Sequence, residues 1–252
     1  MRIRIFLLLS MAFLLSGCTS TSKKPSQLRI GQFLFTKDSV EVSFKKHGEL
    51  ISKHNLSYGD LTNYSEIESA VYDVEVSLNN ALLLKKKMGI GTGGVYTLII
   101  NGIPQKDMKT NQKTTNMKLH EIVEGEEAIY ANGNLPQMRI LNDEFECGKK
   151  ESKIRWVHLS PGVEEISAKA YSEKSKTTSL SALTYPKISK DFAVNLNQQE
   201  IKWELKGSKV QVSKRSIPIE DQYLYTCFLL PDEGKYLDSL KVVIGETRKK
   251  GF

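Results

Sequence analysis

One short stretch of this chain contains residue types that could do acid–base chemistry. His158 and Ser160 lie two residues apart in "IRWVHLSPGVEEISAKAY" (154–171), and a nucleophilic serine needs a histidine within hydrogen-bond reach. In an extended strand, however, two such residues stand about 6.5 Å apart along the chain. Pro161 removes a backbone donor and biases the residue before it toward extended geometry, so the strand should end there. We therefore predict that His158 and Ser160 are structural and that the chain has no catalytic residue.

Other residues that could hold a phosphate group or a metal lack the spacing that such sites need. The run GIGTGG at 89–94 is followed by a strand pattern and by no P-loop lysine, which favours a hairpin turn. His47, His54 and His120 are far apart, with no closely spaced Cys/His pair to suggest zinc. We expect no metal and no cofactor.

The N-terminus has the features of an export signal. Two arginines precede an apolar run at 5–15, which is too short to span a bilayer because spanning takes roughly 20 apolar residues. The following sequence LSGC, which ends at Cys18, resembles the bacterial lipobox. The resemblance implies a signal peptide at 1–17, lipid attachment at Cys18 and contact with a membrane through that lipid. Thr19 stands where an aspartate would favour inner-membrane retention, so we expect the outer membrane.

The mature chain is only mildly basic. The full sequence has 36 Lys and Arg against 29 Asp and Glu, and the expected signal peptide removes two arginines and no acid, which leaves a net charge of +5. The basic residues are interleaved with acidic ones, whereas a nucleic-acid-binding protein concentrates its charge on one face or stripe. We therefore expect a solvated surface and no nucleic-acid partner.

Short alternating runs of apolar and charged residues predict half-buried antiparallel strands. Clear examples are 40–45, 72–78 and 201–206, and helical periodicity is almost absent. Trp156 and Trp203 lie in such runs and are expected in the core, with an aromatic platform for sugar rings as the alternative. The chain is predicted to be all-β.

The strand pattern is repeated along the chain. Three landmarks of the first half recur in the second half, in the same order, at shifts of 126, 127 and 129 residues. They are Arg29 and Arg155, Tyr58 and Tyr185, and Tyr96-Thr97 and Tyr225-Thr226. Small loop insertions would cause such a drift, so we predict a duplicated domain. The predicted parts are a polar tether at 18–27, domains at 28–124 and 150–246 that fold independently, and a connecting segment at 125–149.

The second copy opens with RWVHLSP at 155–161, which resembles the R-x-x-H-x-S-P motif of a bacterial surface-domain family of unknown function. The family's repeats carry a central tyrosine and close with a Tyr-Thr strand, which here would be Tyr185 and Tyr225-Thr226. The resemblance implies tandem antiparallel β-sandwiches similar to immunoglobulin-like modules, found in secreted and lipid-anchored proteins.

The chain departs from the family pattern at two places. Residues 162–164 are Gly-Val-Glu, where the family usually has an acidic residue and a second proline. The first copy has Gln-Phe-Leu-Phe at 32–35 in place of the His-Ser-Pro of the second. If the motif were catalytic, the first domain would be inactive.

Two cysteines would remain for a disulfide once Cys18 is acylated. Cys147 precedes the first strand of the second domain and Cys227 lies in its Tyr-Thr strand. First and late strands of a sandwich can be neighbours, and the exported compartment is oxidising, so we predict a Cys147–Cys227 disulfide. The alternative is a buried free Cys227 and an exposed Cys147.

These features predict a lipid-anchored cell-envelope protein that is not an enzyme. It would act as a binding or adhesion module for an envelope polymer, such as a glycan, or for an envelope protein, because sandwiches often bind through end loops or exposed edges. The alternative is an accessory subunit of a machine that exports or modifies polysaccharide, whose binding surface would be apolar where exposed.

Overall fold

The computed structural model describes residues 24–104, 134–161, 163, 165–172, 175–195, 200–207, 216–233 and 239–249. The predicted signal peptide, Cys18, most of the tether and His120 lie outside these residues. Within them, no helix is long and apolar enough to cross a membrane.

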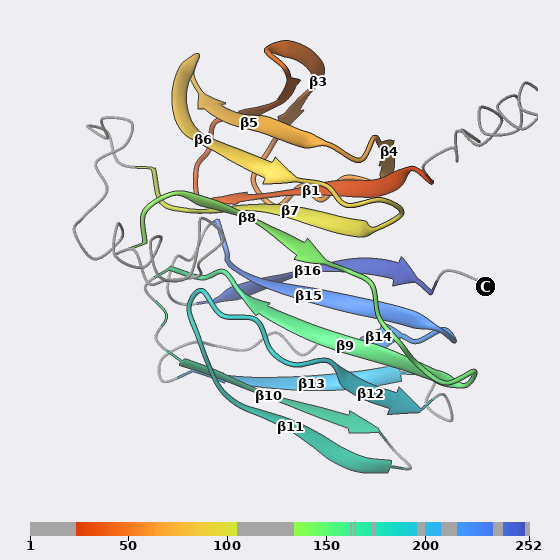
Figure 1. Cartoon of the computed structure of the whole chain (residues 1–252). Helices are drawn as coiled ribbons and strands as arrows, with labels where there is room; N and C mark the ends of the chain where they lie inside the picture. Colours follow the sequence, from red (N-terminus) through yellow and green to blue (C-terminus); the bar gives the residue numbers. More distant parts are fainter. Residues whose placement is uncertain are drawn as a thin grey trace, which may run out of the picture.

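The first half of the chain forms two four-stranded sheets that pack face to face (Figure 1). The inner sheet has the order β4 (Ser65–Ile67), β1 (Ser26–Leu34), β7 (Val95–Gly102) and β8 (Gln137–Asn142). The outer sheet has the order β3 (Glu49–Leu56), β2 (Val40–Lys46), β5 (Val71–Leu78) and β6 (Ala81–Gly89). We call this pair of sheets the first sandwich.

The second half builds the same architecture, the second sandwich. Its inner sheet has the order β12 (Phe192–Asn195), β9 (Glu151–His158), β15 (Tyr223–Pro231) and β16 (Leu240–Arg248). Its outer sheet has the order β11 (Ser175–Thr184), β10 (Glu165–Ser172), β13 (Glu200–Gly207) and β14 (Ser216–Pro218). The predicted all-β class with two tandem sandwiches is confirmed.

The strand register agrees with the repeat read from the sequence. Arg29 is opposite Thr97 in one inner sheet, and Arg155 is opposite Thr226 in the other. In both copies this contact joins the first strand to the seventh, and the two strands run parallel. The inner sheets are therefore mixed, which corrects the expectation of purely antiparallel sandwiches.

One strand lies where a connection was expected. β8 falls within the predicted connecting segment at 125–149, yet it pairs along its whole length with β7 and completes the first inner sheet. Met138 of β8 is buried in the core between the two sheets of the first sandwich, which gives the strand a reason to pair there. The last strand, β16, extends past the predicted boundary at 246 to Arg248.

The outer-sheet strands follow the alternating pattern of their sequence. On β2, Val40, Val42 and Phe44 point into the core and are almost fully buried. The opposite face carries ion pairs, such as Lys45 to Glu75 at 2.6 Å. Strands with one apolar and one charged face suit a sheet that is covered on one side only.

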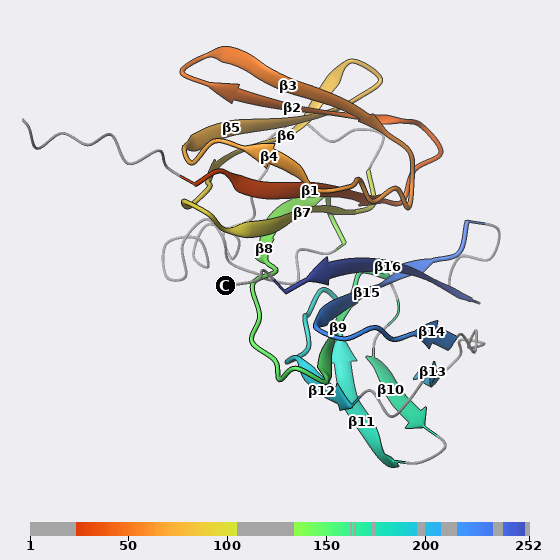
Figure 2. The same cartoon turned by 90° about the vertical axis from the view of Figure 1, so that its right-hand side faces the viewer.

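The inner sheets are covered on both faces, so the molecule is a stack of four sheets (Figures 1 and 2). Each sandwich has its own apolar core, and a third apolar cluster lies between the two inner sheets. This third cluster combines Phe33 and Ile99 of the first sandwich with Val157 and Phe228 of the second. We call the surface buried there the sandwich interface.

Candidate functional site at the sandwich interface

His158 and Ser160 do not form a nucleophile–base pair. The backbone N–H of Ser160 donates a hydrogen bond of 3.2 Å to Nδ1 of His158, while Oγ of Ser160 and Nε2 of His158 make no hydrogen bond. Burial lowers the pKa of His158 to about 4, against a smaller opposing effect of the Val163 backbone. The imidazole is therefore neutral at pH 7, and one of its two nitrogens holds the backbone at the end of β9.

The first copy makes the same contact with a different side chain. Gln32 stands at the position of His158, at a shift of 126, and its Oε1 accepts the backbone N–H of Leu34 at 2.5 Å. Leu34 in turn stands at the position of Ser160. The motif position thus supplies an acceptor for the backbone two residues later in both copies.

The two motif arginines reach across the sandwich interface to corresponding places. Nη1 of Arg29 donates to the backbone oxygen of Glu246 at 3.0 Å, and Nη1 of Arg155 donates to that of Asn142 at 3.0 Å. Strand pairing makes Glu246 and Asn142 counterparts, because they lie opposite Tyr225 and Tyr96. Each copy therefore holds the end of the other copy's last strand.

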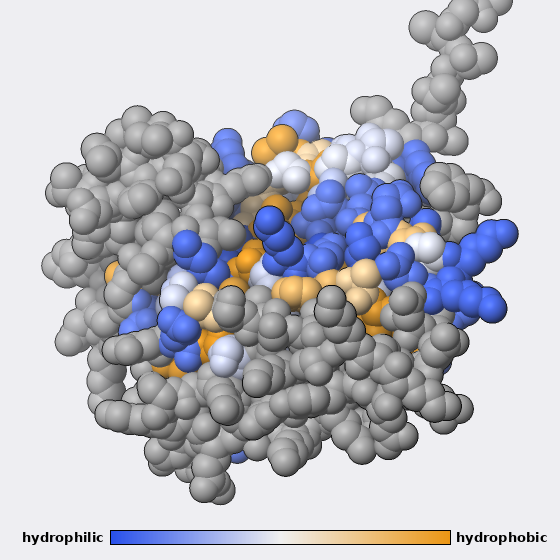
Figure 3. Space-filling view, turned by 90° about the horizontal axis from the view of Figure 1, so that it is seen from below, coloured by the Kyte–Doolittle hydropathy of each residue, from blue (hydrophilic) through white to orange (hydrophobic). Residues whose placement is uncertain are grey.

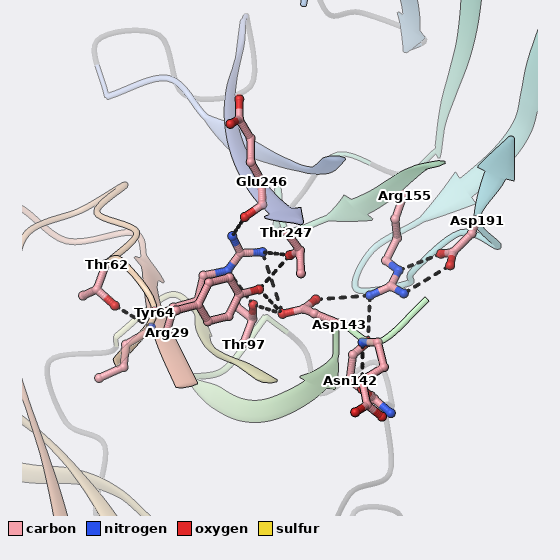
Figure 4. Close-up of polar contacts among 12 residues, drawn as sticks. Arg29, Thr62, Tyr64, Thr97, Asn142, Asp143, Arg155, Asp191, Glu246 and Thr247 are labelled. Carbon is pink, nitrogen blue, oxygen red and sulfur yellow. Dashed lines mark hydrogen bonds and ion pairs between the residues drawn. The ribbon is translucent and has the colours of Figure 1, made fainter. Parts of the chain in front are cut away.

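Asp143 lies between the two arginines and is fully buried (Figure 4). Its carboxylate is 3.7 Å from Arg29 and 3.3 Å from Arg155. The hydroxyls of Thr97 and Tyr64 also donate to it, so its charge is both paired and hydrogen-bonded, as a buried carboxylate requires.

Tyr64 and Asp191 complete this network. The Tyr64 ring lies 4.5 Å from the guanidinium carbon of Arg29, and burial followed by the Asp143 charge raises the pKa of Tyr64. Asp191 accepts both Nε and Nη2 of Arg155, at 2.8 and 3.3 Å. The arrangement fixes two cations and two carboxylates and leaves none of them unpaired.

The motif tyrosines are also used at the interface, toward its other end. Tyr58 donates to the Pro231 backbone oxygen at 2.8 Å, and Tyr185 accepts the side-chain amide of Asn101 at 3.1 Å. Each tyrosine thus contacts the seventh strand of the opposite copy near the end of that strand. The remaining motif residues are internal: Tyr225 accepts the Glu220 N–H at 2.8 Å, and Thr226 and Pro161 are buried.

Two open grooves flank the end of β16 where the sandwiches meet. The linker groove, of about 710 Å³, is lined by residues 143–146 together with Lys24, Lys153, Asp191, Arg248 and Lys249. The loop groove, of about 700 Å³, is lined by residues 59–64 together with Gln27, Tyr223, Glu246 and Arg248. Both grooves are lined by acidic and basic side chains that can form hydrogen bonds.

The predicted disulfide is absent, because the two cysteines occupy different places. Cys227 is fully buried in the core of the second sandwich, opposite Ile244, and Cys147 is partly exposed. The Cys147 carbonyl accepts a hydrogen bond from the side chain of Lys249, which follows the end of β16, whereas Cys227 lies opposite Ile244 within that strand. A disulfide needs Cα atoms within about 7 Å.

The remaining sequence candidates occupy structural positions. Trp156 is buried in the core, as expected, and the Trp203 side chain lies outside the described part. His47 sits at the β2–β3 turn with a φ of 53°. No group of three or more His, Cys, Asp or Glu side chains in the described residues could hold a metal ion.

Sequence reasoning missed Asp143, Tyr64 and Thr247. All three lie just outside strands or at their ends, where alternation carries no signal. The repeat gave a partial signal for this site, because it places Arg29 and Arg155 at corresponding positions on the first strand of each copy.

Comparison with known proteins gives no family. No family model and no curated protein matches this chain. The Bacillus anthracis TIE protein is 10% identical with a TM-score of 0.25, over 87% of this chain and 34% of that one. A leucine-rich repeat protein from Bacteroides thetaiotaomicron is 8% identical with a TM-score of 0.20, over 81% of this chain and 25% of that one. A candidate cell adhesion protein from Bacteroides ovatus is 8% identical with a TM-score of 0.24, over 92% of this chain and 99% of that one. This chain spans about a third and a quarter of the length of the first two. TM-scores this low assign neither a fold family nor a function.

Proposed function

We propose that this protein is a lipid-anchored, non-enzymatic binding module of the bacterial outer membrane, and that it holds a polar envelope polymer, such as a glycan, in the grooves beside β16. The observation that carries the proposal is the use of the motif residues. His158, the base that a catalytic interpretation would need, makes an internal contact, and so do the motif residues Arg155 and Tyr185.

The composition of the grooves supports a polar ligand. The loop groove places the partly exposed rings of Tyr64 and Tyr223 beside Asn63, Thr62 and Asp60. An aromatic face next to hydrogen-bonding groups suits a sugar ring, which has both apolar C–H faces and hydroxyls. The lipobox at Cys18 would keep the module at the membrane.

The alternative, a subunit docked by an exposed apolar surface, has less support. The large exposed apolar residues among those described are Leu50, Ile51, Val71 and Leu82. They lie on three strands of one outer sheet with charged neighbours such as Lys45 and Asp73 between them. On the face seen in Figure 3, polar and apolar residues are likewise interspersed over the coloured part.

A co-sedimentation experiment tests the proposal. The chain from residue 19 onward, which lacks the lipid, is mixed with isolated outer membranes or with peptidoglycan sacculi. We expect the chain to co-sediment with one of these two preparations. The double variant Asn63→Ala/Arg248→Ala should lose at least tenfold in affinity, because both exposed side chains line the loop groove.

The matched control is Lys53→Ala/Lys87→Ala, which alters two exposed or half-exposed side chains of the first outer sheet. It should bind like the unaltered chain. No sedimentation with either preparation, or equal binding by the groove variant, would contradict the proposal.

In the full chain, Cys18→Ser should abolish incorporation of labelled palmitate.

A further inference from the structure

Two polar residues of the sandwich interface, Asn101 and Arg139, have apolar counterparts in the other copy, and a third, Gln137, has a charged one. Their side chains belong to β7 and β8 of the first sandwich, and the strand register fixes their counterparts in the second. Asn101 corresponds to Leu230, Gln137 to Lys241 and Arg139 to Val243. Asn101 and Arg139 therefore have no polar counterpart in the second copy, and the repeat does not account for them.

Arg139 is a buried cation with no carboxylate partner among the described residues. The residue is only 5% exposed, and Nη1 donates to the Pro186 backbone oxygen at 2.7 Å. Nε and Nη2 are buried and make no hydrogen bond. Burial lowers the pKa of Arg139 to about 10, so the side chain is still charged at pH 7. An uncompensated buried charge costs several kcal/mol.

Arg155 shows the same arrangement with its anion in place. Its Nη1 also donates to a backbone oxygen, that of Asn142, while Nε and Nη2 bind the two oxygens of Asp191 (Figure 4). Two parallel N–H donors on one edge of a guanidinium match the two oxygens of a carboxylate or phosphate. No acceptor among the described residues binds this same edge of Arg139.

Gln137 offers a third unpaired donor on the same face of β8. It lies two residues before Arg139 on β8, so both side chains project from the same face of the strand. Its Nε2 is buried and makes no hydrogen bond. The opposite residue Asn101 leaves Oδ1 unpaired, an acceptor that a hydroxyl of a protonated oxyanion or a water molecule would satisfy.

We propose that Arg139 and Gln137 form a buried site for one small oxyanion, either a carboxylate or a phosphate group. Nε and Nη2 of Arg139 bind two of its oxygens, and Nε2 of Gln137 donates to one of them. The Tyr185–Pro186 turn, held by Asn101 and Arg139, must move to admit the anion. Binding is therefore slow. The site is independent of the grooves beside β16, because neither Arg139 nor Gln137 lines them.

Thermal unfolding of the full chain in detergent tests this site. Melting temperatures are compared in chloride, phosphate, sulfate and acetate at one ionic strength. We expect a saturable rise of several degrees in at least one oxyanion over chloride, because a ligand of the folded state stabilises it by mass action. A rise in acetate identifies a carboxylate site, and a rise in phosphate or sulfate alone identifies a phosphate-type site.

Two variants and one control make the result specific. Arg139→Met removes the unpaired charge at similar volume, so it should melt higher than the unaltered chain in chloride and show no oxyanion shift. Arg139→Lys keeps the charge but loses the paired donors, so it should need at least tenfold more anion. Lys53→Met, at an exposed lysine of β3 that lines neither groove, should keep the full shift.

The proposal is overturned if the unaltered chain melts at the same temperature in all four salts. It is also overturned if Arg139→Met or Arg139→Lys keeps the full shift, since the anion would then bind elsewhere. If Arg139→Met does not fold, Arg139→Lys still decides between these outcomes.

Discussion

At the scale of single residues, the His158 position makes the same backbone contact in both copies with two different side chains. His158 and Gln32 differ in chemistry, yet each accepts a backbone N–H two residues later at the end of the first strand of its copy. The first copy therefore departs from the His-Ser-Pro pattern without losing the contact. A catalytic role would require the imidazole, whereas this role requires only an acceptor at the right reach.

We predict that His158→Gln keeps the stability of the protein to within about 1 kcal/mol, while His158→Ala lowers it by about 1–3 kcal/mol because a buried N–H loses its acceptor. Urea unfolding at pH 7.5 measures both changes. Equal losses in the two variants would mean that the ring itself, and not its acceptor, is needed.

His158 also gives stability a pH dependence whose sign follows from burial. The pKa of His158 is about 4 in the folded protein and about 6.5 when unfolded. Between these values the unfolded state binds a proton that the folded state does not. Stability is therefore full above about pH 6.5 and falls as the pH is lowered toward 4, by about 2 kcal/mol at pH 5. His158→Gln should lack this part of the loss.

At the scale of elements, the inner strands explain what the sequence could and could not predict. The alternating runs at 40–46 and 71–78 were predictable, because each strand is covered on one face only. The buried runs YTLII in β7 and YTCFLL in β15 do not alternate, which is typical of strands covered on both faces. Those two runs were the signal for the sandwich interface.

Other features depend on three-dimensional neighbours that no local pattern records. The short strand β8 could not be assigned to the first sheet before its partner β7 was known. The pairing of Asp143 with Arg29 joins residues 114 positions apart. The disulfide prediction was wrong for the same reason, because strand order alone does not place Cys147, which precedes β9, relative to the buried Cys227.

We predict that Phe228→Ala in β15 lowers the free energy of unfolding by about 3–5 kcal/mol, as for other buried aromatic truncations. The Phe228 ring is fully buried at the sandwich interface, with its centroid 4.8 Å from that of Phe33. Leu50→Ala, at a residue that is 56% exposed on β3, is the control and should change stability by less than about 0.5 kcal/mol. A small effect of Phe228→Ala would show that the interface contributes little.

At the scale of the whole molecule, the two copies resemble the subunits of a symmetric dimer joined in one chain. In such an interface the same patch contacts itself, so that each contact occurs twice. Here Arg29 and Arg155 make such reciprocal contacts around an apolar centre, and Tyr58 and Tyr185 each contact the seventh strand of the opposite copy through different atoms. A separated copy would expose this surface, so the interface argues against the independent folding expected from the repeat.

Equilibrium unfolding in urea, followed by two probes on the same sample, tests most directly whether the two sandwiches unfold as one unit. The chain has two tryptophans, Trp156 and Trp203, and both belong to the second sandwich. Tryptophan fluorescence therefore reports the second sandwich alone, and far-ultraviolet circular dichroism reports both. We predict a single transition with the same midpoint and slope for the two probes. A fluorescence transition at a different urea concentration from the dichroism, or two steps in the dichroism, would contradict it.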